Sequence, residues 1–345
     1  MMDISKPITD SITKNFATFK NSDLLSMRNV CKYFRKSANE VLNERIKPLV
    51  IVNGTIRNAA NQKIFSLYKQ QLNTISASDD EFKNFSMLQK WHAENGLLFD
   101  DYNDLTPLKR RLSGPMYLRI APFGNSMIID HELSLYSGSK LSNGHPRSAI
   151  IFPKMPHASI SMKVFAGRAH VYSRQWLKVM REPKLIVAFQ NNALSLSDIM
   201  TTVDTKISPL LKDRSVPICY ALQVESEIRF KRLSSFVVFH GSNVEASVFV
   251  EETANEEELR QKLLEWKNGL KFLESHHIVA FRLHKVNVEP ENSEKIFSEI
   301  FGIELSTLRL PMSDRYETGS IYFNSHSKAE KLLGPTYAIV GFKKI

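Results

Sequence analysis

The apolar residues of this chain occur in short runs, and that spacing limits the fold more than any other feature. The longest runs, such as Leu49–Val52 and Phe236–Phe239, have the length of a strand. A helix that crosses a bilayer needs roughly 20 consecutive apolar residues, so the sequence predicts a protein that does not span a membrane. With 345 residues, 43% apolar and 10% aromatic, the chain can build two or three packed units.

The N-terminal residues and the two cysteines indicate the cellular compartment of the protein. The first twelve residues carry three charged side chains and no continuous hydrophobic region, which argues against a secretory signal. We therefore expect an intracellular protein, cytoplasmic or nuclear. The two cysteines, Cys31 and Cys219, lie far apart and form no metal-ligand spacing, so neither a disulfide framework nor a zinc site is predicted. No cofactor is expected.

Regular elements are predicted along the middle of the chain. Leu49–Val52 is strand-like, with Asn53-Gly54 as a turn. Residues 64–72 and 79–95 have helical patterns, the second closed by Gly96, and 138–146 is loop-like. Five β-branched and aromatic runs predict strands. They are Tyr117–Ile120, Ala149–Phe152, Ile160–Phe165, Leu185–Phe189 and Ser235–Phe239.

The last hundred residues predict the order helix, strand, helix, strand. The first helix begins at a capping box made by Thr253 and Glu256 or by Asn255 and Glu258. A strand at 278–288 follows, then a helix that ends at Gly302 and a strand at 303–310. This order is typical of βα units.

Two stretches of this region share the L-x-x-L-x-L pattern of leucine-rich repeats. Leu283-x-x-Val286-x-Val288 and Leu305-x-x-Leu308-x-Leu310 are 22 residues apart, counted from 283 to 305. Leu233-x-x-Phe236-x-Val238 is a degenerate earlier match. An ordinary pair of βα units explains the same pattern, and two copies do not decide between these interpretations.

The first fifty residues predict two helices. Ile8, Ile12, Phe16 and Phe19 form one apolar stripe. A second helix is expected from the capping residues Asn21–Asp23 to before Pro48. Its apolar positions are Leu24, Met27, Val30, Cys31, Phe34, Ala38, Val41 and Leu42.

If this segment is a single helix, Leu25 and Phe34 cannot face the same neighbour. Leu25 and Phe34 are nine positions apart and point in opposite directions. We therefore expect Val30 and Phe34 to pack internally, whereas Leu25 and the Phe16 and Phe19 side of the first helix are left for a partner.

The segment Asp23–Arg35 resembles the second half of an F-box, which reads D-L-L-x-x-R-x-V-C-K-x-F/W-R. The opening differs, because Lys6-Pro7 stands where Leu-Pro is usual. The arrangement as a whole is similar to the divergent F-box families expanded in nematodes. The resemblance implies that the apolar residues of this module bind a Skp-type adaptor, which links to a cullin-RING ubiquitin ligase, while the C-terminal region binds a target protein. The predicted partner-binding residues are Ile12, Phe16, Phe19, Leu24, Leu25, Val30 and Phe34.

The small size of this segment also favours a docking role. A helical segment of about forty residues is too small to bury its own apolar face fully, so these side chains must be covered by the rest of the chain or by another protein. The sequence thus predicts an α+β chain of three parts. They are an F-box-like helical module at 1–48, a mixed α/β region at 49–250, and an α/β region at 251–345 with leucine-rich character.

Two other functions compete with the adaptor. The net charge is +10, and residues 1–72 hold twelve Lys and Arg against five Asp and Glu, so a nucleic-acid-binding protein is the alternative. It would use Arg28, Lys32, Arg35 and Lys36, which lack the interleaved aromatics that stack on bases, so nucleic acid is the less favoured partner. The familiar catalytic signatures do not occur in the sequence, and we expect no enzyme and no catalytic residues, although a site assembled by folding would leave no motif.

Overall fold

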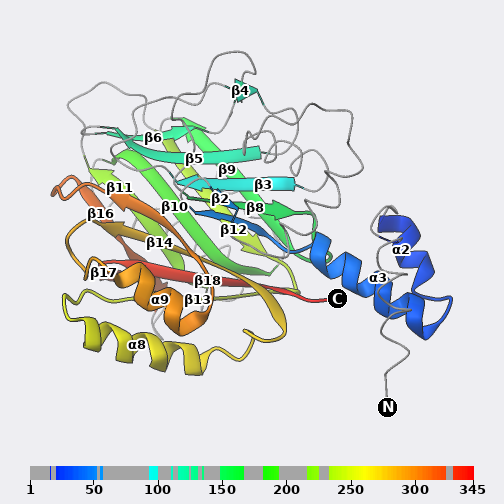
Figure 1. Cartoon of the computed structure of the whole chain (residues 1–345). Coiled ribbons are helices and arrows are strands. Elements are labelled where there is room, and N and C mark those ends of the chain that lie inside the picture. The colour runs from blue at the N-terminus through cyan, green and yellow to red at the C-terminus, as the bar shows by residue number, and fades with distance from the viewer. Residues whose placement is uncertain are drawn as a thin grey trace.

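The computed structural model describes residues 16, 21–52, 55–56, 93–99, 110–111, 116–123, 126–130, 134–135, 148–166, 182–193, 216–224, 233–323 and 329–345. Within these ranges the chain is mostly β, with two helices standing beside a β-rich body and two more lying against it (Figure 1). The helices are α2 (Asn21–Met27), α3 (Lys32–Arg45), α8 (Glu256–Gly269) and α9 (Ser293–Phe301). None of these four is long and apolar enough to cross a membrane.

The first sheet has the order β2-β1-β8-β3-β5-β6. Its strands are β1 (Leu49–Val52), β2 (Thr55–Ile56), β3 (Ala93–Phe99), β5 (Met116–Phe123), β6 (Ser126–Asp130) and β8 (Ser148–Pro153). β1 and β2 are antiparallel with Val52 opposite Thr55, and the predicted Asn53-Gly54 turn lies outside the described residues. Only β3 and β5 are parallel neighbours within this sheet.

The second sheet has the order β17-β16-β11-β10-β12-β9. Its strands are β9 (Ser159–Ala166), β10 (Pro183–Ala193), β11 (Ile218–Val224), β12 (Leu233–His240), β16 (Tyr316–Phe323) and β17 (Ala329–Leu333). Both faces of its central strands are buried, since Ile186 and Val187 point to opposite faces and both are inaccessible to solvent. This explains why these strands are near-continuous apolar runs rather than alternating ones.

The third sheet has the order β13-β18-β14-β15. Its strands are β13 (Val244–Val250), β14 (His276–Lys285), β15 (Leu305–Leu310) and β18 (Thr336–Lys343). α8 and α9 cover one face of it, through a cluster that includes Leu263, Phe297 and Ile339. A small separate pair joins β4 (Arg110–Arg111) to β7 (Ser134–Leu135).

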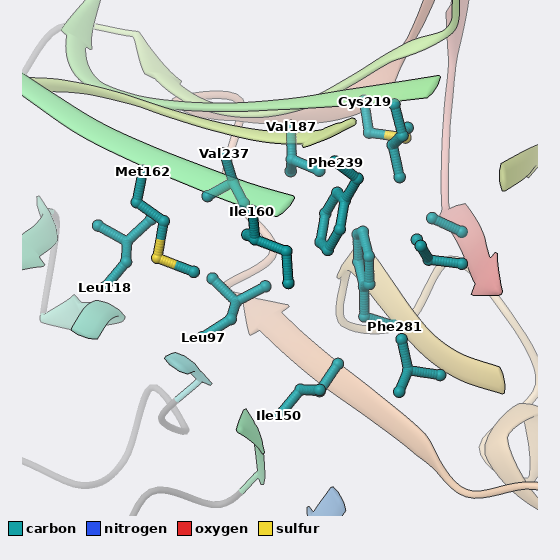
Figure 2. Close-up of a cluster of buried hydrophobic side chains, with 14 of the residues drawn as sticks. Leu97, Leu118, Ile150, Ile160, Met162, Val187, Cys219, Val237, Phe239 and Phe281 are labelled. Atoms are coloured by element: carbon teal, nitrogen blue, oxygen red, sulfur yellow. The ribbon is translucent and has the colours of Figure 1, made fainter. Parts of the chain in front are cut away.

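One hydrophobic core joins the three large sheets (Figure 2). Leu97 and Ile150 come from the first sheet, Phe239 from the second and Phe281 from the third. The Phe239 and Phe281 rings are stacked with centroids 6.2 Å apart. β16 pairs with β11 in the second sheet, so residues before and after position 250 contribute to the same sheet and core.

The five predicted strand runs of the middle region are confirmed as parts of β5, β8, β9, β10 and β12. The helix predicted to reach Asn95 is wrong at its end, because β3 already begins at Ala93. There Leu97 and Phe99 lie on one buried face between β5 and β8, and sheet pairing outweighs local helix propensity. The predicted helix at 64–72, most of that at 79–95 and the 138–146 loop lie outside the described residues.

The C-terminal order of helix, strand, helix, strand is confirmed. Asn255 is the N-cap of α8, where its Oδ1 accepts from the backbone N–H groups of Glu257 and Glu258 at 2.9 and 3.1 Å. Thr253 donates instead to the Glu258 carboxylate, at 2.7 Å. α9 ends at Gly302 with φ 70°, the left-handed conformation that favours glycine.

The strand register favours an ordinary βα unit over leucine-rich repeats. β14 and β15 are parallel with Ala280 opposite Leu305 and Leu283 opposite Leu308, so strand positions are offset by 25 residues (305 minus 280), not by 22. β18 pairs antiparallel with β14, and the earlier match at Leu233 lies in the second sheet. A solenoid would instead stack matching positions in successive parallel strands.

Candidate interaction surface

The N-terminal module contains two helices where the sequence predicted one from Asn21 onward. α2 ends at Met27, and a turn follows in which Asn29 N–H donates to Ser26 O at 3.2 Å and Val30 N–H to Met27 O at 3.1 Å. Cys31 is extended, with φ −159° and ψ 172°, before α3 begins. Asn, Val and Cys are poor helix formers, which explains an interruption that the apolar spacing does not reveal.

The two helices share a small core. It consists of Phe16, Leu24, Ala38, Val41 and Leu42, with Met27, Phe34 and Ile345 packed against it. Phe16 and Phe34 meet edge to face, with ring centroids 5.2 Å apart and planes at 77°. This arrangement is typical of favourable aromatic pairs, and it holds Phe16, five positions before the start of α2, against α3.

Two apolar side chains of the same module point outward. Leu25 is 50% exposed and Val30 is 62% exposed, whereas Leu24 is fully buried. The expectation that Val30 packs internally is wrong, because it lies in the turn between the helices. Leu25 and Phe34 belong to different helices, so the single-helix argument that separated them does not apply.

The predicted partner-binding residues therefore fall into two sets. Phe16, Leu24 and Phe34 pack within the module, and Leu25 and Val30 are on its surface. Ile12 and Phe19 lie outside the described residues. Binding of a partner by any of these residues stays a prediction.

Basic side chains lie beside the exposed pair. Lys32, Arg35 and Lys36 are exposed on α3 and Arg28 is half-buried in the turn. Arg35 Nε donates to the Arg28 carbonyl oxygen at 3.1 Å, which ties α3 to the turn. The surface thus combines a small apolar centre with charged neighbours, as protein interfaces do.

The last residue of the chain attaches this module to the body. Asn43 Nδ2 donates to the Ile345 carbonyl oxygen at 3.0 Å, and Ile345 N–H donates to Asn43 Oδ1 at 2.6 Å. Ile345 packs against both the module core and the shared core, and Ile46 at the end of α3 belongs to the shared core. The C-terminal end of α3 is therefore fixed to the β body.

The body holds a buried charged network around Arg282 of β14. Arg282 donates to Glu289 at 3.1 Å and to Glu294 at 2.9 Å, and it also contacts Ser293 Oγ. Tyr337 O–H donates to the other Glu289 oxygen. Burial raises the pKa of Glu289, and the Arg282 charge opposes that rise. The network joins the first turn of α9 to β14 and β18.

His284 takes part in this network as a neutral ring. Burial lowers the pKa of His284 well below its ordinary value, and the charges of Arg282 and Arg309 lower it further. Arg282 Nη2 lies 3.2 Å from His284 Nε2. Because a guanidinium can only donate, Nε2 is the acceptor and the ring proton is on Nδ1, 3.7 Å from Glu289. The buried Arg282 cation is paired with two carboxylates, as in structural ion-pair networks. Among the described residues, Arg282 Nε and His284 Nδ1 have no hydrogen-bond partner.

Sequence reasoning missed both the Arg282 network and the Asn43–Ile345 contact. The signal for the network was two ionisable residues, Arg282 and His284, at alternate positions directly after the apolar run Ile278–Phe281. Across the described ranges, no three His, Cys, Asp or Glu side chains gather in a way that could hold a metal ion. No protein-family model matches the chain, and no curated protein matches it.

Proposed function

We propose that this chain is the substrate-recognition adaptor of a Skp-cullin-F-box type ubiquitin ligase. The module of α2 and α3 binds a Skp-type adaptor, which brings the cullin-RING ligase, and the C-terminal part of the β body binds a target protein. The chain works by binding and performs no chemistry of its own. Its place of action is inside the cell, in the cytoplasm or nucleus, where such ligases operate.

The observation that carries the proposal is the opposite placement of two neighbouring leucines. Leu24 is fully buried in the module core, and Leu25 is 50% exposed beside Val30. Both leucines belong to the D-L-L segment that resembles an F-box. The first stabilises the module, and the second is left for the partner, in the manner of a helix surface that docks into a groove.

The attachment of the module supports the same proposal. Asn43 and Ile46 fix the end of α3 to the body, so a protein bound at Leu25 is held in a defined direction from the β sheets. A ligase subunit must present its target at a defined place, and a rigid connection lowers the entropic cost of doing so.

Co-purification tests the proposal directly. The full chain is expressed with a Skp-type adaptor and a cullin, and the three proteins are isolated through a tag on the chain. We expect wild type to retain both partners, and a Leu25→Asp, Val30→Asp variant to lose them because a charge enters the apolar centre of the interface.

A matched control distinguishes binding at this surface from nonspecific hydrophobic association. Leu264 on α8 is another exposed leucine, and Leu264→Asp is expected to retain both partners. Circular dichroism shows that each variant is folded. Failure of wild type to retain the adaptor, or equal retention by the double variant, contradicts the proposal.

A further inference from the structure

The β17 edge of the second sheet is open among the described strands. β17 pairs with β16 on one side, and no described strand pairs with its other side. It carries Leu332 and Leu333, which are 50% and 52% exposed. An edge strand with adjacent exposed leucines is a surface on which another strand can add.

The direction of the backbone groups on this edge follows from one hydrogen bond. Gly334 N–H donates to Thr318 O at 3.0 Å, which makes Thr318 and Gly334 a hydrogen-bonded pair. In an antiparallel ladder such pairs alternate with non-bonded ones. Leu332 therefore points its N–H and C=O toward β16, whereas Lys331 and Leu333 point theirs toward the open edge.

We propose that this edge pairs with the β17 edge of a second copy of the chain, in an antiparallel ladder centred on Leu332. A two-fold axis through the ladder places Lys331 opposite Leu333 of the other copy, twice, which forms four backbone hydrogen bonds. The two Leu332 side chains face one another in the close, non-bonded pair. This dimer does not depend on the proposed function.

The two neighbouring registers of the ladder are less favourable, one because it opposes like charges and the other because it lacks a backbone donor. Centring the ladder on Lys331 sets two lysines opposite one another, and cross-strand like charges destabilise a sheet. Centring it on Leu333 brings Pro335 opposite Lys331, and proline has no N–H to donate. In the register centred on Leu332, Lys331 keeps its ion pair with Glu317, 2.9 Å away on β16, and its stem lies along Leu333 of the other copy.

The position of β17 leaves the N-terminal module free. β17 lies on the side of the body away from α2 and α3 (Figure 1). The second copy therefore does not cover Leu25 or Val30, and the dimer would carry two module surfaces.

Light scattering on the full purified chain tests the dimer. A small interface is weak, so the concentration is varied from about 1 to about 200 µM. We expect the mass to rise with concentration from 39.5 kDa toward twice that value. Leu332→Lys places a charge at the two-fold axis, and Lys331→Pro removes an outward N–H without touching the ladder to β16. Both variants are expected to stay monomeric.

Two controls isolate the edge. Lys331→Ala removes the ion pair to Glu317 but keeps the N–H, and Leu264→Lys changes an exposed leucine elsewhere. Both are expected to dimerise as wild type does. A wild-type chain that is monomeric at every concentration overturns the proposal. The β17 edge would then be available to pair with a strand of another protein. A dimer that persists in both Leu332→Lys and Lys331→Pro overturns it as well.

Discussion

Asn43 of α3 and the backbone of Ile345 form a reciprocal pair of hydrogen bonds across 302 positions of the chain. The amide side chain donates to the Ile345 carbonyl oxygen and accepts from its N–H, as a neighbouring β-strand would. Through this pair α3 is joined to a residue two positions beyond the end of the last strand, β18.

Replacing Asn43 by Ala should destabilise the full chain by about 1–3 kcal/mol, because two partly buried backbone groups of Ile345 lose their partner. Urea unfolding measures the change. Asn39→Ala is the matched control on the same helix, since Asn39 Oδ1 accepts no hydrogen bond, and it should change stability by less than about 0.5 kcal/mol. Equal effects of the two substitutions would contradict a specific role for the Asn43 contact.

Removing Arg282 should be far more damaging than removing an arginine from a surface pair. Arg282→Met leaves Glu289 buried without its cation, which is expected to cost about 3–5 kcal/mol. Arg260 is paired with Glu299 at 2.9 Å on a partly exposed surface, and Arg260→Met should cost about 1 kcal/mol or less. Adding Glu289→Gln to Arg282→Met should recover part of the loss, and a strictly additive double variant would show that the two side chains are not coupled.

Stability should fall in mild acid because three histidines resist protonation in the folded chain. Burial lowers the pKa of His276 and of His284, and it lowers that of His277 to about 4. The unfolded chain takes up these protons near pH 6.5, so it binds more protons than the folded chain does below that pH. The free energy of unfolding should then fall as pH drops from about 6.5 to about 4, by about 1.4 kcal/mol per pH unit for each proton taken up.

Urea unfolding between pH 7.5 and 5 checks this slope. Glu289 opposes the trend, since its raised pKa makes the folded chain hold a proton that the unfolded chain has lost. His284→Gln should reduce the slope, because it removes one of the three titrating groups. A slope that is unchanged in this variant, or a stability that rises toward pH 5, would contradict the assignment of a neutral His284.

The basic surface of the module should not make the chain a nucleic-acid-binding protein. The Arg35 guanidinium donates to the Arg28 carbonyl oxygen, the Phe34 ring packs against the module core, and Lys32 Nζ lies over the Tyr33 ring, 5.1 Å from its centroid. We expect no tight binding of RNA or DNA near physiological salt. Binding that persists there, and disappears when Arg28, Lys32, Arg35 and Lys36 are changed to alanine, would favour the alternative function.

Strands were predictable where β-branched and aromatic residues dominate a short segment. Leu185–Phe189 is such a case, because its burial on both faces makes the local pattern and the sheet agree. β3 was not predictable, since Gly96 and the polar residues before it favour the end of a helix and only pairing with β5 and β8 makes them a strand. The break between α2 and α3 was also not predictable, because the helical spacing of apolar residues continues across it.

The candidate site was predictable only in part. The D-L-L segment marked Leu24 and Leu25 together, and their opposite exposure depends on how α2 packs against α3. The Arg282 network joins β14 to Tyr337, 55 positions away. Spacing along the sequence carries no information about such a contact, so only the fold reveals it.

Adaptor binding by Leu25 is tested by the dissociation constant for a purified Skp-type adaptor, measured by calorimetric titration of the full chain and of its Leu25→Ala variant. We predict that wild type binds the adaptor at micromolar or lower concentration and that Leu25→Ala binds about 1–2 kcal/mol more weakly, with the same melting temperature as wild type. Leu24→Ala, in contrast, should lower stability by about 2–5 kcal/mol because it opens a cavity in the module core. An adaptor that fails to bind wild type at micromolar concentration, or that binds Leu25→Ala equally well, would show that the module of α2 and α3 is not the adaptor-binding surface.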